Sequence, residues 1–127
     1  MSRTVVIRVG TAEQVRRELQ QHWGALQRGE RTHQPREIWF SSIAQLATVL
    51  TEKRLELLRL IRRRRPRSVS HLASLAQRAV KAVERDVQAL ERAALVRLVG
   101  SGKTRRPVAS CDRIHLAGDI DIARAAA

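Results

Sequence analysis

The order of apolar and polar residues predicts a strand followed by an amphipathic helix at the start of the chain. The run TVVIRV (4–9) is rich in β-branched residues and ends at Gly10, as a short strand would. Thr11 can then cap a helix over 12–28. Its apolar positions recur every three or four residues, at Val15, Leu19, Trp23 and Leu26. Such a stripe must pack against another surface.

The middle of the chain has helical spacing interrupted by turn residues. After the polar connection GERTHQPRE, the run IWF is short enough for a strand or for the lead into the helix SSIAQLATVL. Thr51 marks the start of a leucine-rich helix, which Pro66 ends inside the run RRRR, because a residue before proline disfavours helical geometry. Ser68 is a good cap for a two-turn helix, VSHLASLAQ.

A longer amphipathic helix and two strands follow a break at 77–79. In VKAVERDVQALERAAL the apolar positions face the core, and they are Val80, Val83, Val87, Leu90 and Ala94. The segment LVRLVGSGKTRRPVASCDRIHLAG predicts two strands around a glycine-containing turn, with apolar members Val96, Leu98, Val108, Ile114 and Leu116. Its GSGKT resembles the end of a phosphate-binding loop. Arg97 stands where such a loop needs its first glycine, which argues against nucleotide hydrolysis.

Composition restricts the possible functions. A length of 127 residues indicates one domain, and its net charge of +13 indicates an acidic partner. Residues 51–106 carry most of this charge, with sixteen basic and five acidic side chains. Only Trp23, Trp39 and Phe40 are aromatic, so a base-stacking platform is not expected. No apolar run is long enough for a membrane span or a signal peptide, which predicts a cytoplasmic, nucleoid-associated protein.

Few residues are available for metal binding or catalysis. Cys111 is the only cysteine, which excludes an internal disulfide, and with His115 nearby it does not complete a tetrahedral metal site. We therefore expect no metal and no other cofactor. No acid pair and no nucleophile with a base can be assembled, so we expect that the protein is not an enzyme.

Charges are segregated on the helix that begins near Val80. At 100° per residue, Gln88, Lys81, Arg92, Arg85 and Arg78 fall at about 80° to 160° from Val80. The acids Glu84, Asp86 and Glu91 flank the apolar face instead. The small residues Ala82 and Ala89 lie between the long cations, which would let this helix approach a surface closely. A solvated helix face normally mixes both signs, so the pattern indicates a surface for a polyanion.

The order helix, short helix, turn, basic helix and basic hairpin resembles the winged helix-turn-helix regulators of the MarR/ArsR type, especially compact antitoxin-like members. The resemblance covers residues 38–116 and rests on the leucine-rich helix, SVSHLA, VERDVQALERAALV and the glycine-tipped hairpin. Two glycines common in these regulators are absent, one from the turn LAQRA and one at Ala94. The resemblance implies an α+β fold, mainly α with a small β-hairpin, and a homodimeric repressor that binds double-stranded DNA at a palindromic operator.

The resemblance also assigns roles to residues and segments. The base-reading residues would be Arg78, Lys81, Ala82, Arg85 and Gln88. Contacts to the DNA backbone, including those of the wing, would come from Arg64, Arg65, Arg67, Ser68, Ser70, His71, Lys103, Thr104, Arg105 and Arg106. Arg62 and Arg63 would partly serve the helix end. Residues 1–37 would form the dimerisation extension, with the stripe Val15, Leu19, Trp23 and Leu26 as interface, and residues 117–127 a flexible tail.

Two other functions remain open. A basic winged helix can bind structured RNA through its shape and backbone. An antitoxin-like protein could instead use the stripe in the first helix to cover a toxin-like partner protein.

Overall fold

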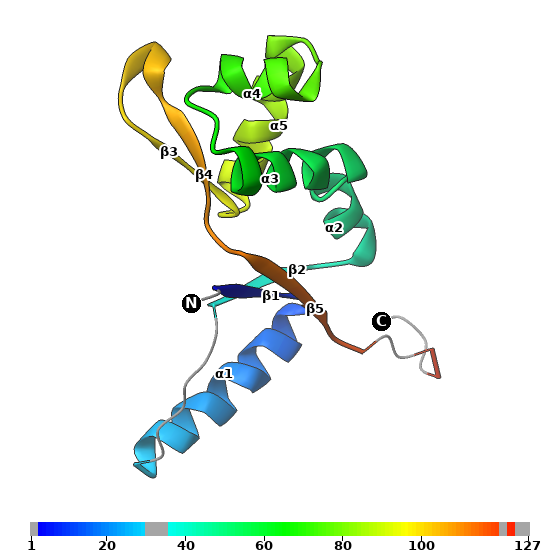
Figure 1. The fold of residues 1–127 in the computed structure, drawn as a ribbon. Coiled ribbons are helices and arrows are strands. Elements are labelled where there is room, and N and C mark those ends of the chain that lie inside the picture. Colours follow the sequence, from blue (N-terminus) through cyan, green and yellow to red (C-terminus); the bar gives the residue numbers. More distant parts are fainter. Residues whose placement is uncertain (1–2, 30–35, 120–121, 124–127) are drawn as a thin grey trace. The chain divides into compact units, whose positions relative to one another are not determined.

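A computed structural model describes residues 3–29, 36–119 and 122–123, except the side chains of Leu26 and Lys103. In these ranges the chain forms five α-helices, one short 3-10 helix and five β-strands, so the predicted α+β class is confirmed (Figure 1). Two consecutive helices, α2 (Ile43–Val49) and α3 (Glu52–Arg64), lie in the middle of the chain. The predicted tail at 117–127 lies mostly outside the described residues.

The contacts divide the described chain into two compact units. One consists of Arg3 with residues 47–113, and the other of residues 4–29 and 36–46 with residues 114–119 and 122–123. The domain limits predicted from the sequence lie at 37 and 116.

The smaller unit is built around the strand β1 (Thr4–Val9). It pairs in parallel with β2 (Arg36–Phe40), and the three-stranded sheet has the order β2-β1-β5. Val5, Val6 and Ile7 of this central strand are buried. The helix α1 (Ala12–Gln27) connects β1 to β2. Its predicted cap is confirmed, since Thr11 Oγ1 accepts a hydrogen bond from the Gln14 backbone N–H while Gln14 Oε1 accepts one from Thr11 N–H.

The prediction that Ile114 and Leu116 lie in the second strand of the hairpin is wrong, because both belong to the separate strand β5 (Arg113–Ala117). The hairpin strand ends at Ala109, and β5 joins the sheet beside β1 instead. The physical reason is that the central strand β1 has backbone donors and acceptors on both edges, and a buried edge needs a partner. Residues 110–112, which interrupt the apolar spacing, connect β4 of the two-stranded sheet to β5 of the three-stranded sheet.

The larger unit packs three helices on a two-stranded hairpin. The helices are α3, α4 (Val69–Ala76) and α5 (Val80–Arg92), and the antiparallel strands are β3 (Val96–Val99) and β4 (Arg106–Ala109), joined through the 3-10 turn Gly102–Thr104. The predicted starts at Thr51 and Ser68 are confirmed, because each side-chain oxygen accepts a backbone N–H three residues later. The core is aliphatic, and its buried members include Leu57, Leu58, Ile61, Leu72, Val83, Val87, Leu90, Leu95 and Val96.

Among the described residues, three other than glycine have a positive φ, and each lies just after a helix or shortly before a strand. Arg65 follows α3 with φ 47°, Gln77 follows α4 with φ 56°, and Ala94 precedes β3 with φ 64°. Gln77 and Ala94 are at the places where the resembling regulators commonly carry glycine. The turns therefore keep the left-handed geometry without the residue that adopts it most readily, at a cost in backbone strain.

Candidate functional site

The outer side of α5 exposes three cations and an amide. Lys81, Arg85, Gln88 and Arg92 are all solvent-exposed, while Val83, Val87 and Leu90 are buried on the opposite side. We call the exposed set Lys81, Arg85, Gln88 and Arg92 the basic face. Glu84 and Glu91 are also exposed, toward the edge of this face, as the helical spacing predicts.

Three details of this helix differ from the predicted arrangement. Ala89, predicted between the outer cations, is buried at 9% exposure, and Ala82 is half-buried. Val80, predicted in the core, is 39% exposed, because it lies in the first turn at the edge of the core. Arg78 lies before the helix, which begins at Val80, so its position on the helical wheel is wrong. The basic face is therefore narrower than the sequence indicates.

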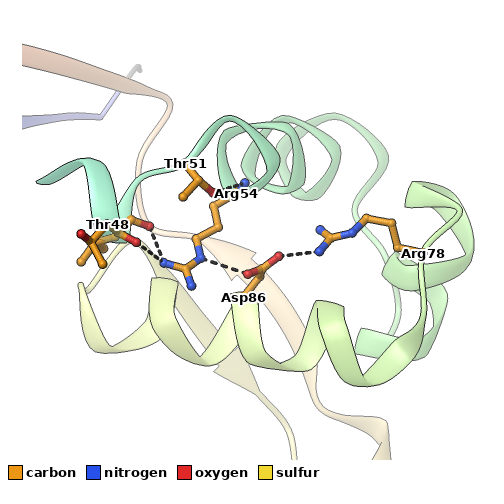
Figure 2. Close-up of polar contacts among 6 residues, drawn as sticks. Thr48, Thr51, Arg54, Arg78 and Asp86 are labelled. Carbon is orange, nitrogen blue, oxygen red and sulfur yellow. Dashed lines mark hydrogen bonds and ion pairs between the residues drawn. The ribbon is translucent and has the colours of Figure 1, made fainter.

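Arg78 belongs to a network centred on Asp86, which Figure 2 shows. Asp86 accepts hydrogen bonds from Arg54 Nε at 3.0 Å and from Arg78 Nη2 at 2.8 Å. Arg54 Nη1 also donates to the backbone oxygens of Thr48 and Val49, at 2.9 and 2.8 Å. The network thus joins the end of α2, the first turn of α3, the turn before α5 and the middle of α5.

The Asp86 carboxylate is well stabilised in its charged form. Burial alone would raise its pKa, but the hydrogen bonds and charges of Arg54 and Arg78 outweigh burial and lower the pKa below its usual value. The side chains of Arg54, Arg78 and Asp86 are only 20%, 23% and 15% exposed. Two arginines at one carboxylate fix the direction of α5, and with it the direction of the basic face.

The start of α4 is organised by its own cap. Ser68 Oγ accepts the His71 backbone N–H at 3.0 Å, and His71 Nδ1 accepts the Arg67 backbone N–H at 3.0 Å. His71 is therefore held in an orientation in which Nδ1 accepts a backbone hydrogen bond. Ser70 and Arg67 are exposed beside this cap, so both can reach a ligand.

The arginine run divides between a structural and an exposed part. Arg62 forms an ion pair with Asp112, whose pKa is lowered by a hydrogen bond from the Arg3 backbone N–H and by Arg62. The helix ends at Arg64, inside the run, as predicted. Arg63, Arg64 and Arg65 are exposed, with the Arg65 N–H bonded to the Ile61 carbonyl at 3.2 Å. The contact that the structure shows for Arg62 differs from its predicted role at the helix end, since Arg62 binds Asp112 of a later segment.

The hairpin tip carries exposed polar and basic residues. Thr104, Arg105 and Arg106 are exposed, and Thr104 Oγ1 donates to the Ser101 carbonyl at 2.9 Å. The prediction for Lys103 concerns a side chain outside the described part of the structure. GSGKT lies in a hairpin turn between antiparallel strands, whereas a phosphate-binding loop follows a strand of a parallel sheet and leads into an α-helix.

Two clefts in this unit show which of these residues come together. One groove, of about 490 Å³, is lined by Ser70 at the start of α4, by Glu84 and Gln88 of α5 and by Arg105 of the hairpin. A second cleft, of about 440 Å³, includes Arg65 and Arg106. The residues predicted to read bases or hold phosphates, from Arg64 to Arg106, thus belong to the larger unit, but they surround more than one hollow.

The predicted interface stripe on α1 is largely exposed. Leu19 is 62% and Trp23 63% exposed, and Val15 is half-buried. The side chain of Leu26 is outside the described residues. Two large apolar side chains on one helix face are thus left in solvent.

Sequence reasoning missed the roles of Arg54, Asp86 and Asp112. A signal for Asp86 was available, because its helical position flanks the apolar face, where an unpaired carboxylate would be unfavourable. The partners Arg54 and Arg78 lie 32 and 8 residues away, and no local pattern identifies them.

Comparison with known proteins identifies a family for this chain. The model of the HVO_A0114 family matches residues 49–116. This match covers more than half of the chain, so the chain belongs to the HVO_A0114 family. No curated protein matches the chain. Within the described residues, no helix is long and apolar enough to cross a membrane.

Proposed function

We propose that this member of the HVO_A0114 family is a winged helix-turn-helix protein that binds double-stranded DNA and represses transcription as a homodimer. In this proposal α4 and α5 are the helix-turn-helix and the β3–β4 hairpin is the wing. The observation that carries the proposal is the basic face, which is exposed on α5. Arg54 and Arg78 hold this helix through their ion pairs with Asp86.

The basic face has the size and chemistry for the major groove. That groove is about 12 Å wide and admits one α-helix, whose outward side chains reach the base edges. Arg85 and Lys81 can donate to guanine, and Gln88 can form paired hydrogen bonds with adenine. Arg78 is held by Asp86, so we assign it to positioning α5, although the resemblance gave it a base-reading role. Ala82 is half-buried and offers at most a methyl contact.

The surrounding cations suit the phosphates on either side of the groove. Ser70 and Arg67 are exposed at the start of α4, and Arg105 and Arg106 on the hairpin. The groove shared by Ser70, Gln88 and Arg105 supports this division, because it brings all three elements around one hollow. Contacts to phosphates provide affinity without sequence preference, and they weaken steeply as salt is added.

The exposed stripe on α1 is the proposed dimer interface. A single small module has limited affinity, so two copies commonly bind half-sites about one helical turn apart. Burial of Leu19 and Trp23 against a second copy would remove two large apolar side chains from water. We propose a cytoplasmic, nucleoid-associated location, because the proposed ligand is chromosomal DNA. The same exposed stripe favours a second candidate, an antitoxin-like module whose α1 covers a toxin-like protein.

Selection from a randomised DNA library tests the proposal. The full chain would be incubated with random duplexes at increasing salt, and the bound fraction sequenced at each step. We expect a palindromic motif whose half-sites are about one helical turn apart. Bound DNA without any enriched motif would contradict sequence-specific binding and would leave an architectural or RNA-directed surface. A second protein that co-purifies in equal amount, with no DNA bound, would favour the antitoxin-like candidate.

Two variants separate base reading from phosphate contacts. Arg85→Ala should lower the preference for the selected site, by about 1–3 kcal/mol at one base position. Arg105→Ala should weaken selected and random DNA alike and reduce the salt slope by about one. Arg59→Ala, an exposed arginine on α3, is the matched control for loss of charge. Equal effects of all three variants would refute this assignment of roles.

A further inference from the structure

We propose that the cleft between the end of α3 and the strand β4 binds a small phosphorylated molecule with an apolar body. The cleft has a volume of about 440 Å³, within the range of small-molecule sites in proteins. Its cations come from three separate segments of the larger unit, namely Arg3, Arg62, Arg65 and Arg106. No residue of α4 or α5 lines the cleft, and Arg106 is the one residue that it shares with the phosphate contacts named in the proposed function, so binding of a small molecule can be measured without DNA.

The cleft has an excess of positive charge. Its one acidic lining residue, Asp112, is already occupied, because it pairs with Arg62 and accepts the Arg3 backbone N–H at 2.8 Å. Arg65 and Arg106 are exposed and form no ion pair with an acid in the described part of the chain. Two guanidinium groups at one cleft match the paired oxygens of a phosphate, which each can bind through two N–H groups.

The positions of these two arginines are fixed by the backbone. Arg65 has a left-handed conformation at the end of α3, and its N–H is bonded to the Ile61 carbonyl. Arg106 is the first residue of β4 and pairs with Val99 of β3. Because both backbones are held by regular elements, binding of an anion must order the two side chains but no segment of backbone.

The remaining lining residues explain why an apolar body is expected. Ile61, Pro107, Val108 and Ala109 line the same cleft. Ile61 and Pro107 are buried, and Val108 and Ala109 are half-buried, so these last two supply its accessible apolar surface. A free phosphate would contact the arginines but leave this apolar surface in water. A phosphate ester with an apolar group would contact both and gain from burial of the apolar part.

Calorimetric titration of the full chain at physiological salt tests the proposal, with phenyl phosphate as probe. We expect phenyl phosphate to bind more tightly than inorganic phosphate. Arg65→Gln and Arg106→Gln should each weaken it about tenfold, as expected for a lost hydrogen bond to a charged group. Arg97→Gln, an exposed arginine on the same hairpin that does not line the cleft, should leave the affinity unchanged.

The position of the probe can be read from amide chemical shifts in the same samples. Shifts at Val108, Ala109 and Asp112 on addition of phenyl phosphate would support the cleft as the site. Equal affinity in all four proteins, or shifts confined to other amides, would overturn it, since the probe would then respond only to overall charge. Equal binding of phenyl phosphate and inorganic phosphate would overturn the apolar part of the proposal.

Discussion

Replacement of Asp86 by alanine should destabilise the larger unit severely. The substitution leaves Arg54 and Arg78 without their shared acceptor, at side chains only 20% and 23% exposed. Removal of one partner from a buried ion pair costs about 3–5 kcal/mol, because the remaining charge is desolvated and unpaired. Since these arginines keep some solvent contact and Arg54 retains two backbone acceptors, we expect about 2–4 kcal/mol.

Urea unfolding followed by circular dichroism at 222 nm is a suitable assay. Trp23 and Trp39 both belong to the smaller unit, so tryptophan fluorescence would not report directly on α3, α4 and α5. The control is Glu91→Ala, which removes an exposed carboxylate from the same helix and should change stability by less than about 0.5 kcal/mol. An Asp86→Ala protein as stable as the Glu91→Ala control would refute the role given to the network.

The stability difference between the wild type and Asp86→Ala should also depend on pH. Because the pKa of Asp86 is lowered in the folded state, its contribution is fully present above the unfolded carboxyl value of about 3.9. This contribution is lost as the pH falls below that value and through the lowered pKa of the folded state. The stability difference between the wild type and Asp86→Ala should therefore be constant from pH 7 to 5 and shrink in stronger acid. A difference independent of pH down to pH 2 would contradict an ionised carboxylate.

Three further predictions concern caps, turns and assembly. Ala94→Gly should raise the free energy of unfolding by about 0.5–1 kcal/mol in urea, because glycine relieves the φ of 64°; a lower stability would contradict strain at this turn. Ser68→Ala should cost about 1 kcal/mol in the same assay through loss of the α4 cap, and an unchanged midpoint would show that the cap contributes nothing. Leu19→Asp with Trp23→Asp should give monomers in analytical ultracentrifugation, while Gln20→Asp on the same helix should not. A dimer that survives the double substitution would place the interface elsewhere.

Local features of the fold were predictable from the sequence where one short segment decides them. The caps at Thr11, Thr51 and Ser68 are confirmed because a cap depends on residues within one turn. The end of α3 in the arginine run follows from Pro66, which restricts its neighbour directly. The buried Val83, Val87 and Leu90 follow from helical spacing.

Features that depend on distant partners were not predictable in this way. Apolar residues at 114 and 116 fit a hairpin strand as well as a sheet strand, and only the open edge of β1 decides between them. The spacing of Arg78 in the sequence fits a cation on the exposed side of α5, but its side chain forms an ion pair with Asp86 of that helix. The cleft with Arg3, Arg65 and Arg106 combines residues more than 100 positions apart, which no local pattern indicates.

Competition between DNA and RNA tests the central claim, that the basic face of α5 reads duplex DNA in its major groove, most directly. A labelled duplex carrying the selected motif would be bound by the full chain, and an RNA duplex of the same sequence and length would be added in increasing amounts. The major groove of A-form RNA is too deep and narrow for an α-helix, so side chains cannot read its bases. We predict that the RNA displaces the motif no better than random DNA does. Displacement by RNA as efficient as by the unlabelled DNA motif would contradict major-groove reading and make RNA the better proposed ligand.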